Sequence, residues 1–473
     1  MKLARYFSVM AVAALLAACG GKGSPAAAPD LLSVTGEEGQ ITLNWTVVPG
    51  VQYRVYCAPG SSVDNYSWYN TFGGLARAGA QDAVLPPFTV DGVQNNTDYA
   101  CTVDGRYNNG AAGPAAASMA THTQSAGSAI WQTTSAITGL TGSVRATAAG
   151  TLSGFTTDKF FAAGTTVAGT SGQLWVSDDY ASGTWSAVSN LPALLGDLNT
   201  VIVYGGAVFV AGSGGVLAYS SDLQTWVTVD MTGPIQKIAS SGARLVAVGA
   251  SGLVRYSTDG AHWVTAAGTG SAALSGVTYS EAGYWVAVGE AGSILVSTTA
   301  DASSWIPAAG AGTGVAQTAN LNSVAALKVQ TPNTTNYVYK LVAVGNSGQV
   351  GYSENGQDWY WKTTAPVTNL MQVAAGNQTL VKLDSSATPS SIYPYSGGQF
   401  MIAGAGGKVW RSGDALAWDK DTLSWEDVSS SANTLADAVS LFRYAKTGHY
   451  SSGVSYAYTW LLYGADGAGR YAR

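Results

Sequence analysis

Short segments in which apolar and polar residues alternate recur along most of the chain, separated by clusters of glycine, proline, asparagine and aspartate. Ile41-Thr-Leu-Asn-Trp45 and Tyr53-Arg-Val-Tyr-Cys57 are two examples. Alternation with a period of two residues predicts half-buried antiparallel strands, and the intervening residues favour tight turns. The pattern therefore predicts an all-β protein.

Composition supports this class and excludes others. Charged residues make up 11% of the 473 residues and glycine contributes 59, whereas about 25% charged residues and about 7% glycine are usual. The chain lacks the periodicity of Ala, Glu, Lys and Leu that helical bundles and coiled coils need. The net charge of −6 and the absence of a basic stripe argue against nucleic-acid binding.

One unit recurs from about residue 130 to the end of the chain. Its clearest copy reads Leu245-Val-Ala-Val-Gly-Ala-Ser-Gly-Leu-Val-Arg-Tyr-Ser-Thr-Asp-Gly-Ala-His-Trp263. The copies end at Trp185, Trp226, Trp263, Trp305, Trp359 and Trp418. Repeats of about forty to fifty residues predict a propeller, in which each repeat forms one four-stranded blade.

The first strands of the repeats predict the number of blades. They lie at Val144, Leu198, Ile235, Gly276, Leu321, Leu370 and Leu435, which makes seven. The last repeat has strands at residues 459–463 and 469–471 and no sequence left for a fourth. Residues 130–133 have strand character and no repeat of their own, so we expect them to close the last blade and remove an exposed sheet edge. Residues 130–473 are thus predicted to form a seven-bladed β-propeller.

The segment Ser-x-Asp-x-x-x-Trp inside the repeat, clearest as Ser-Thr-Asp-Gly-Ala-His-Trp263, resembles the Asp-box (BNR repeat) of the sialidase-like propeller superfamily. The resemblance implies a structural role, in which the Asp or Asn side chain bonds to the amides of its turn and the tryptophan packs between blades. The turn formers so assigned are Asp179, Asp222, Asp259, Asn355 and Asp414, and the packing residues are Trp185, Trp226, Trp263, Trp305, Trp359 and Trp418. The copies that begin at Ser177 and Ser297 are interpreted as stretched by two residues. The glycine of the motif is missing at Leu223 and Ala415.

The wider unit, Ala-Val-Gly-x-x-Gly followed by the box, looks closer to the photosystem assembly factor-like propellers, which act by binding proteins. A sialidase would need three arginines around the substrate carboxylate, but only Arg145 and Arg443 fall in first strands, and the Arg-Ile-Pro motif is absent. His122, His262 and His449 are far apart in sequence and predict no metal site. We therefore expect a protein-binding scaffold with no catalytic residue and no cofactor. A carbohydrate-active propeller, hydrolase or glycan binder, is the alternative.

The order of Trp45, Tyr53 and Tyr99 in residues 30–123 resembles a fibronectin type III domain, and Asn-Thr-Asp-Tyr99 is similar to the tyrosine corner of immunoglobulin-like sandwiches. The fold that this resemblance implies would bring Cys57 opposite Cys101 on neighbouring strands. In an exported chain a disulfide between them is expected. Two buried thiols are the alternative.

The first residues are predicted to be an export signal. Lys2 and Arg5 precede an apolar run that is too short to span a bilayer. The run ends in Leu-Ala-Ala-Cys19, which resembles the lipobox of bacterial lipoproteins. This resemblance implies that residues 1–18 are removed, that Cys19 receives palmitate-type acyl chains, and that residues 19–29 tether the protein to a membrane. Gly20 in place of an aspartate favours the outer membrane, on either side, while an ordinary cleaved signal remains the alternative.

Repeats five, six and seven lengthen the connection between their first and second strands. The insertions span residues 330–339, 384–399 and 446–456, and their tyrosines are Tyr337, Tyr339, Tyr393, Tyr395, Tyr450 and Tyr456. Tyrosine offers a large amphipathic contact area at a low cost in conformational entropy. The insertions are therefore candidates for binding a partner, for docking the N-terminal domain beyond the linker at 124–129, or for mere surface elaboration.

Overall fold

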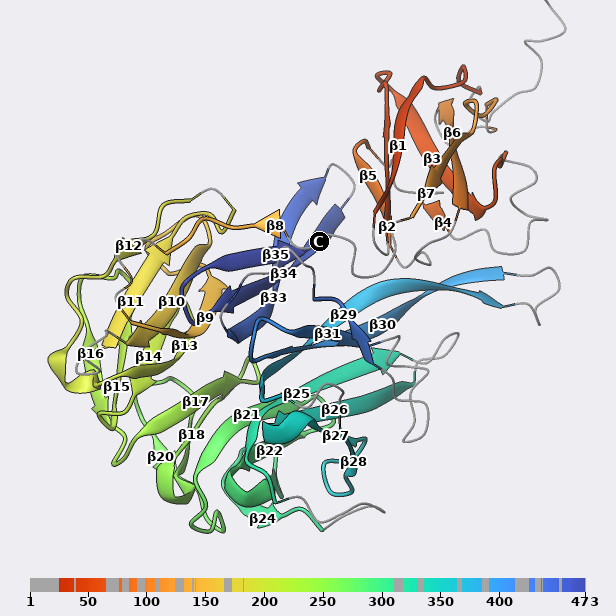
Figure 1. The fold of residues 1–473 in the computed structure, drawn as a ribbon. Helices are drawn as coiled ribbons and strands as arrows, with labels where there is room; N and C mark the ends of the chain where they lie inside the picture. The colour runs from red at the N-terminus through yellow and green to blue at the C-terminus, as the bar shows by residue number, and fades with distance from the viewer. Residues whose placement is uncertain are drawn as a thin grey trace, which may run out of the picture. The chain divides into compact units, whose positions relative to one another are not determined.

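The computed structural model describes residues 25–37, 40–64, 76–78, 85–91, 98–107, 111, 113–123, 132–137, 140, 142–165, 172–181, 183–309, 318–330, 336–363, 368–384, 391–412, 425–429, 435, 437–450 and 453–472. The expected signal sequence, Cys19, the linker at 124–129, Asp414 and Trp418 lie outside these residues. The chain divides into two compact units, one formed mainly by residues up to Ala126 and one mainly by residues from Gly127 onward (Figure 1).

Both units are built from strands, so the predicted all-β class is confirmed. The helices of the described residues are four single 3-10 turns, η2 (Ala193–Leu195), η3 (Ala250–Gly252), η4 (Glu290–Gly292) and η5 (Asn346–Gly348). Within the same residues, no helix has the length and apolar character needed to cross a membrane.

The N-terminal unit contains two antiparallel sheets that share one core. The first sheet has the order β1 (Leu31–Glu37), β2 (Gln40–Trp45), β5 (Phe88–Asp91), and the second has the order β4 (Ala76–Ala78), β3 (Val51–Pro59), β6 (Asp98–Tyr107), β7 (Met119–His122). Leu43 and Trp45 of β2 lie in the same buried cluster as Tyr53 of β3 and Val103 of β6. The rings of Trp45 and Tyr53 are 5.6 Å apart. Alternate residues of β2, β3 and β6 are apolar and buried in this cluster, which fills the space between the sheets.

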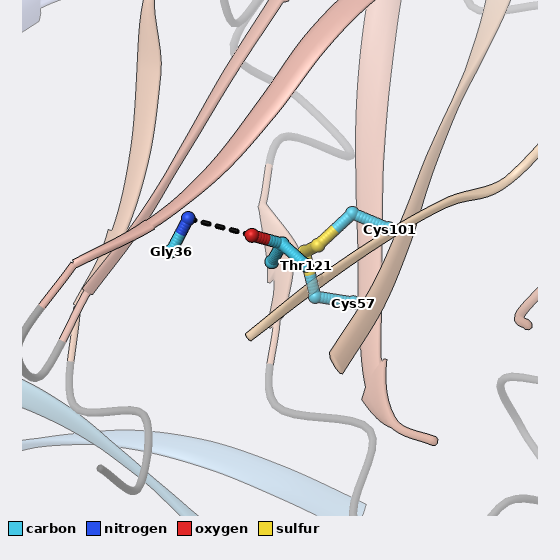
Figure 2. Close-up of a disulfide and its surroundings, with 4 residues drawn as sticks. All are labelled: Gly36, Cys57, Cys101 and Thr121. Atoms are coloured by element: carbon cyan, nitrogen blue, oxygen red, sulfur yellow. Dashed lines mark hydrogen bonds between the residues drawn. A yellow bond between two sulfur atoms is a disulfide. The ribbon is translucent and has the colours of Figure 1, made fainter. Parts of the chain in front are cut away.

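A disulfide joins Cys57 to Cys101 inside this unit (Figure 2). The two residues lie directly opposite each other on β3 and β6, and both are fully buried. At the edge of the two sheets, the Gly36 N–H of β1 donates to Thr121 Oγ1 of β7 at 2.7 Å (Figure 2). A Cβ atom at Gly36 would lie 2.3 Å from the His122 carbonyl oxygen, so only glycine permits this approach.

The C-terminal unit contains seven four-stranded antiparallel sheets among the described residues (Figure 1). The first three are β9 (Val144–Gly150), β10 (Lys159–Thr165), β11 (Gly172–Ser177), β12 (Ser186–Ala187); β13 (Leu198–Tyr204), β14 (Ala207–Gly212), β15 (Val216–Ser220), β16 (Val227–Asp230); and β17 (Ile235–Ser240), β18 (Leu245–Gly249), β19 (Val254–Ser257), β20 (Val264–Thr265). The next three are β21 (Leu274–Ser280), β22 (Tyr284–Gly289), β23 (Ile294–Ser297), β24 (Trp305–Pro307); β25 (Leu321–Gln330), β26 (Tyr337–Gly345), β27 (Gln349–Ser353), β28 (Tyr360–Thr363); and β29 (Leu370–Asp384), β30 (Ser391–Gly404), β31 (Val409–Ser412), β32 (Trp425–Asp427). The last is β33 (Ala438–Tyr450), β34 (Gly453–Gly464), β35 (Gly469–Ala472) and β8 (Gln132–Thr133).

Each sheet packs against the next through a buried apolar cluster, and the seventh packs against the first. The cluster between the first and second sheets contains Leu174 and Val208. The cluster between the seventh and the first contains Leu461 and Phe160. Because every sheet has a neighbour on both faces, the sheets close into a ring.

Hydrogen bonds also join the first strands of neighbouring sheets around the ring. The Ile238 N–H of β17 donates to Thr200 Oγ1 of β13 at 3.2 Å, and the Val373 N–H of β29 donates to Ser323 Oγ of β25 at 3.2 Å. The Thr147 N–H of β9 donates to Ser440 Oγ of β33 at 3.1 Å. A first strand pairs within its sheet on one side only, so these hydroxyl groups satisfy backbone N–H groups on the other side.

The short strand β8 joins the two ends of the ring. Thr133 and Gln132 pair with Arg470 and Tyr471 of β35. The following residue, Thr134, donates its N–H to the Gly469 carbonyl at 3.0 Å. Because β8 precedes the first sheet in the sequence and completes the last one, its pairing fastens the N-terminal end of this unit to the C-terminal end.

The described residues of the lengthened connections in the fifth, sixth and seventh sheets are mainly strand. β25 and β26 have 10 and 9 residues, β29 and β30 have 15 and 14, and β33 and β34 have 13 and 12. The corresponding strands of the third sheet, β17 and β18, have 6 and 5. The added residues continue the ladder, as Lys328 opposite Tyr339 and Gln330 opposite Tyr337 illustrate. The predicted insertions are therefore long hairpins on three consecutive sheets.

Candidate functional site

The turn between the third and fourth strands of the second sheet shows what the predicted box does. Asp222 Oδ1 accepts hydrogen bonds from the Gln224 and Thr225 N–H groups, both at 2.8 Å. Ser220 Oγ accepts from the Leu223 N–H at 2.9 Å. Leu223 has a φ of 64°, so a leucine here occupies a conformation that usually requires glycine. The Asp222 carboxylate therefore stabilises its own turn.

The same turn recurs in the third and fifth sheets. Asp259 Oδ1 accepts from the N–H groups of the second and third following residues, at 2.9 and 2.8 Å. Asn355 Oδ1 does the same at 2.9 Å for both bonds. The indole N–H groups of Trp263 and Trp359 close each turn by donating to the carbonyl of the positive-φ glycine at 2.8 Å. An uncharged asparagine thus performs the same task as an aspartate.

The box of the fourth sheet lies two residues later than we expected from Ser297. Thr299 opens it, Asp301 Oδ1 accepts from the Ser303 N–H at 3.0 Å, and the Trp305 indole donates to the Ala302 carbonyl at 2.9 Å. From Thr299 to Trp305 the spacing is that of the other boxes, while Ser297 still pairs with Trp305 where the strands end. The two extra residues predicted for this copy therefore lie between β23 and its box. Asp301 was missed because threonine stands where the other copies have serine.

The first and sixth sheets depart further from the motif. Asp179 Oδ1 accepts from the Ala181 N–H at 3.1 Å, but the Trp185 indole donates to the Ser135 carbonyl at 3.2 Å, outside the box. In the sixth sheet, Trp425 begins the fourth strand opposite Ser412, in the register in which Trp305 pairs with Ser297. Trp425 therefore takes the position that we had predicted for Trp418.

Hydrogen bonding within these turns stabilises the charged form of their carboxylates. The N–H groups of Thr225 and Gln224 lower the pKa of Asp222 to about 2. The Thr299 hydroxyl and the Ser303 N–H lower the pKa of Asp301 to about 2. The bonds from His262 hold the pKa of Asp259 well below its usual range. Each effect arises inside a separate turn, so these acids do not converge on a common site.

Two of the candidate tyrosines lie on described parts of the fifth-sheet hairpin. Tyr337 is 44% exposed, and Lys328 Nζ of the opposite strand lies 4.3 Å from the centre of its ring. Lys328 also donates to Glu281 Oε2 at 3.0 Å, which raises the pKa of the lysine. Tyr339 lies opposite Lys328 in the ladder. The side chains of Tyr393, Tyr395, Tyr450 and Tyr456 lie outside the described part of the structure.

A groove of about 440 Å³ lies between the fourth and fifth sheets. One wall is formed by residues 269–272, which lead into the fourth sheet, and by residues 292–295 at the start of β23. Pro307 and Ala308 at the end of β24 continue this wall, and Trp359 and Trp361 of the fifth sheet line the groove as well. None of the described residues that line the groove carries a charge.

The two tryptophans have different roles in the groove. Trp359 is buried and its indole closes a box turn. Trp361 is half-buried and lies nearly parallel to Trp359, with ring centres 6.1 Å apart and planes inclined by 25°. Trp361 pairs across the ladder with Gly351, where a Cβ atom would lie 2.6 Å from the indole ring. The missing side chain at Gly351 lets the Trp361 indole lie against the sheet.

A family model described as the DUF6242 beta propeller domain matches residues 125–275. The chain contains a β-propeller domain. The match covers the first sheets of the ring, which carry the predicted repeat. No curated protein matches the chain.

Several solved structures are similar to the chain at low sequence identity. YCF48 bound to D1 peptide has 14% identity and a TM-score of 0.46, covering 72% of this chain and 94% of that chain. The WD40 beta propeller domain of Doa1 has 12% identity and a TM-score of 0.45, covering 72% and 97%. YCF48 from Cyanidioschyzon merolae has 14% identity and a TM-score of 0.44, covering 72% and 98%.

Among the described residues of the propeller and the N-terminal unit, no group of three or more His, Cys, Asp and Glu side chains gathers as it would around a metal ion. His262 Nδ1 is 2.7 Å from Asp259 Oδ2 inside its box, and His122 Nδ1 is 2.7 Å from Asp98 Oδ1 in the N-terminal unit. The features left as candidates for ligand contact are the long hairpins and the groove beside Trp361.

Proposed function

We propose that this chain is a lipid-anchored protein of the bacterial cell envelope, with a fibronectin type III-like domain followed by a seven-bladed Asp-box propeller that β8 closes. The propeller acts as a binding scaffold for a protein partner and not as an enzyme. The anchor is Cys19, and the outer membrane is the expected location. The long hairpins of the fifth, sixth and seventh sheets form the partner site.

The hairpins carry this proposal because the ring does not require them. The third sheet packs on both sides with strands of ordinary length. The lengthened part of β25 adds Leu327 and Val329 to the cluster with the sixth sheet, which anchors this hairpin on the ring. Three neighbouring sheets nevertheless extend the same connection. Exposed Tyr337, supported by Lys328, places an aromatic side chain in contact with solvent, and such residues dominate recognition surfaces.

The Asp-box carboxylates support a non-enzymatic function. Asp222, Asp259 and Asp301 are each hydrogen bonded to backbone amides of their own turns. General acid–base catalysis needs a carboxyl group whose pKa lies near the working pH, whereas these pKa values are lowered. We therefore assign these three carboxylates a structural role in the turns.

Partner capture from intact cells tests the proposal. The full-length protein, cross-linked in the envelope and purified, should retain a specific protein that the Tyr337→Ser/Tyr339→Ser variant loses. Tyr107→Ser is the matched control, because Tyr107 is similarly exposed at 37% and lies in the N-terminal unit. Identical captured proteins from wild type and the hairpin variant would contradict a role for this hairpin.

A further inference from the structure

We propose that the groove between the fourth and fifth sheets binds a neutral oligosaccharide, with the Trp361 indole as the surface against which a sugar ring stacks. This site is separate from the hairpins and does not depend on their function. Its volume of about 440 Å³ falls within the range of small-ligand sites, about 300–1,000 Å³.

The absence of charge in the lining determines the class of ligand. In the part of the chain that the structure describes, every lining residue is Gly, Ala, Ser, Thr, Leu, Ile, Pro or Trp. A nucleotide, a sialic acid or a phosphorylated group would lose the hydration of its charge without gaining an opposite charge, which is unfavourable. A neutral ligand has no such penalty.

Trp361 offers a flat apolar surface whose orientation is fixed in advance. The indole packs against Trp359 on one side and lies over Gly351 in the ladder. Trp359 is itself held by its bond to the Gly356 carbonyl at 2.8 Å. A surface that is already ordered loses little conformational entropy when a ligand stacks on it.

Hydroxyl groups around this surface provide the polar part of the site. Thr269, Ser271 and Ser293 line the groove, and none of their side chains forms a hydrogen bond within the described part of the chain. A hydroxyl group can both donate and accept, as sugar hydroxyls also require. The combination of one apolar platform and a few uncommitted hydroxyls matches a sugar ring, with its apolar face and its polar rim.

A proline-rich peptide is the other neutral ligand that stacks on tryptophan. Peptides in the polyproline II conformation dock into grooves lined by several aromatic side chains. Among the described lining residues, Trp361 is the one aromatic side chain with substantial exposure, since Trp359 is 2% exposed. The geometry thus favours a compact sugar over an extended peptide.

Titration of the full-length protein with cellotriose, maltotriose, triacetylchitotriose and a proline-rich decapeptide tests the proposal, by calorimetry and tryptophan fluorescence. At least one neutral trisaccharide should bind, and Trp361→Ala should weaken that binding by about tenfold or more at a temperature at which circular dichroism shows the variant to be folded. Trp361→Phe should weaken it less, because a ring remains.

A second variant keeps the test valid if loss of Trp361 impairs folding. Ser271 is exposed and lines the groove, so Ser271→Trp should fill the groove and abolish binding. Ser221→Trp makes the same change at an exposed position of the second sheet and should leave binding intact. Absence of binding by all three sugars, undiminished binding by Ser271→Trp, or binding of the peptide alone would overturn the proposal.

Discussion

In the second sheet, one carboxylate oxygen of Asp222 accepts two successive backbone N–H groups. The fifth sheet makes the same two bonds with Asn355. The geometry of the turn therefore requires the oxygen and not the charge. The charge instead makes the stability of the turn depend on pH, because the bonds favour the ionised form.

We expect Asp222→Asn to reduce the acid sensitivity of the propeller. The pKa of Asp222 falls from its ordinary value of 3.8 to about 2 on folding. Its contribution is therefore fully present above about pH 4 and is lost as the pH falls toward 2. The amide oxygen of the substituted side chain would keep the two N–H bonds, so the melting temperature at pH 7 should change little while its decline between pH 4 and 2 becomes shallower.

The matched control is the double variant Asn355→Asp/Asp358→Asn, because the Asn355 Nδ2 donates to Asp358 Oδ2 at 2.8 Å and the single change would place two carboxylates in contact. The double variant moves the carboxylate into the box and keeps a donor opposite it, so it should make the decline steeper. Thermal unfolding followed by circular dichroism from pH 7 to pH 2 measures both variants. Asp259 and Asp301 remain in both, so the decline should be altered and not removed. If the melting temperature falls with pH equally steeply in the two variants, the box carboxylates do not couple folding to pH.

Backbone strain at single residues gives a second prediction. Ala291 has a φ of 50° and precedes Gly292, whose φ is 73°, in the turn between β22 and β23. Alanine in the left-handed region costs about 1–2 kcal/mol, part of which glycine recovers. Ala291→Gly should stabilise the protein by about 0.5–1 kcal/mol in urea unfolding. Gly292→Ala should shift the midpoint in the opposite direction, and a shift in the same direction would contradict the assignment of strain.

The boxes show which residues a sequence motif can identify. Asp222, Asp259 and Asn355 follow the Ser-x-Asp spacing and could be predicted to form turns. Asp301 could not, because its box begins with threonine and places Ala302, with a φ of 62°, where the motif has glycine. Trp425 was missed because the segment before β32 is longer than in the other repeats.

At the scale of elements, the strands of the ring were readable from alternation, whereas the groove was not. Trp361 and Gly351 lie ten residues apart in the sequence and come together only through the pairing of β27 with β28. The opposite wall comes from the fourth sheet and from the segment leading into it. A site that two sheets build jointly leaves no local pattern in the sequence of either.

The strand β8 has only two residues, too few to show alternation. It could be predicted because the last repeat needed a fourth strand. Its two residues complete the last sheet by pairing with β35. A chain that starts at Ser143 lacks β8, exposes the edge of β35, and should self-associate through that edge. A chain that starts at Ser125 retains β8 and should be monomeric. Sedimentation velocity distinguishes the two, and a stable monomer from the Ser143 start would show that the ring holds without β8.

For the whole molecule, the sheets of the propeller ring differ in the length of the connection between their first and second strands. The second and third sheets have short connections, and the fifth to seventh have long hairpins. The ring could be predicted because each repeat carries its own packing residues. The ligand could not be predicted, because the residues that define the repeat form its turns and pack between its sheets and therefore say nothing about a ligand. The hairpins that we propose as the partner site lie outside the features that define the repeat.

The membrane anchor that we propose for the whole molecule depends on one side chain, that of Cys19. The chain has three cysteines, and Cys57 and Cys101 pair with each other, so Cys19 is the cysteine outside this disulfide and the one that the lipobox resemblance marks for lipidation. One acyl chain binds a membrane only marginally, whereas several anchor it stably. Cys19→Ala should abolish palmitate labelling, block processing after residue 18, and move the protein out of the membrane pellet. Cys57→Ser/Cys101→Ser should retain the label, and persistent labelling of the Cys19→Ala variant would refute the anchor.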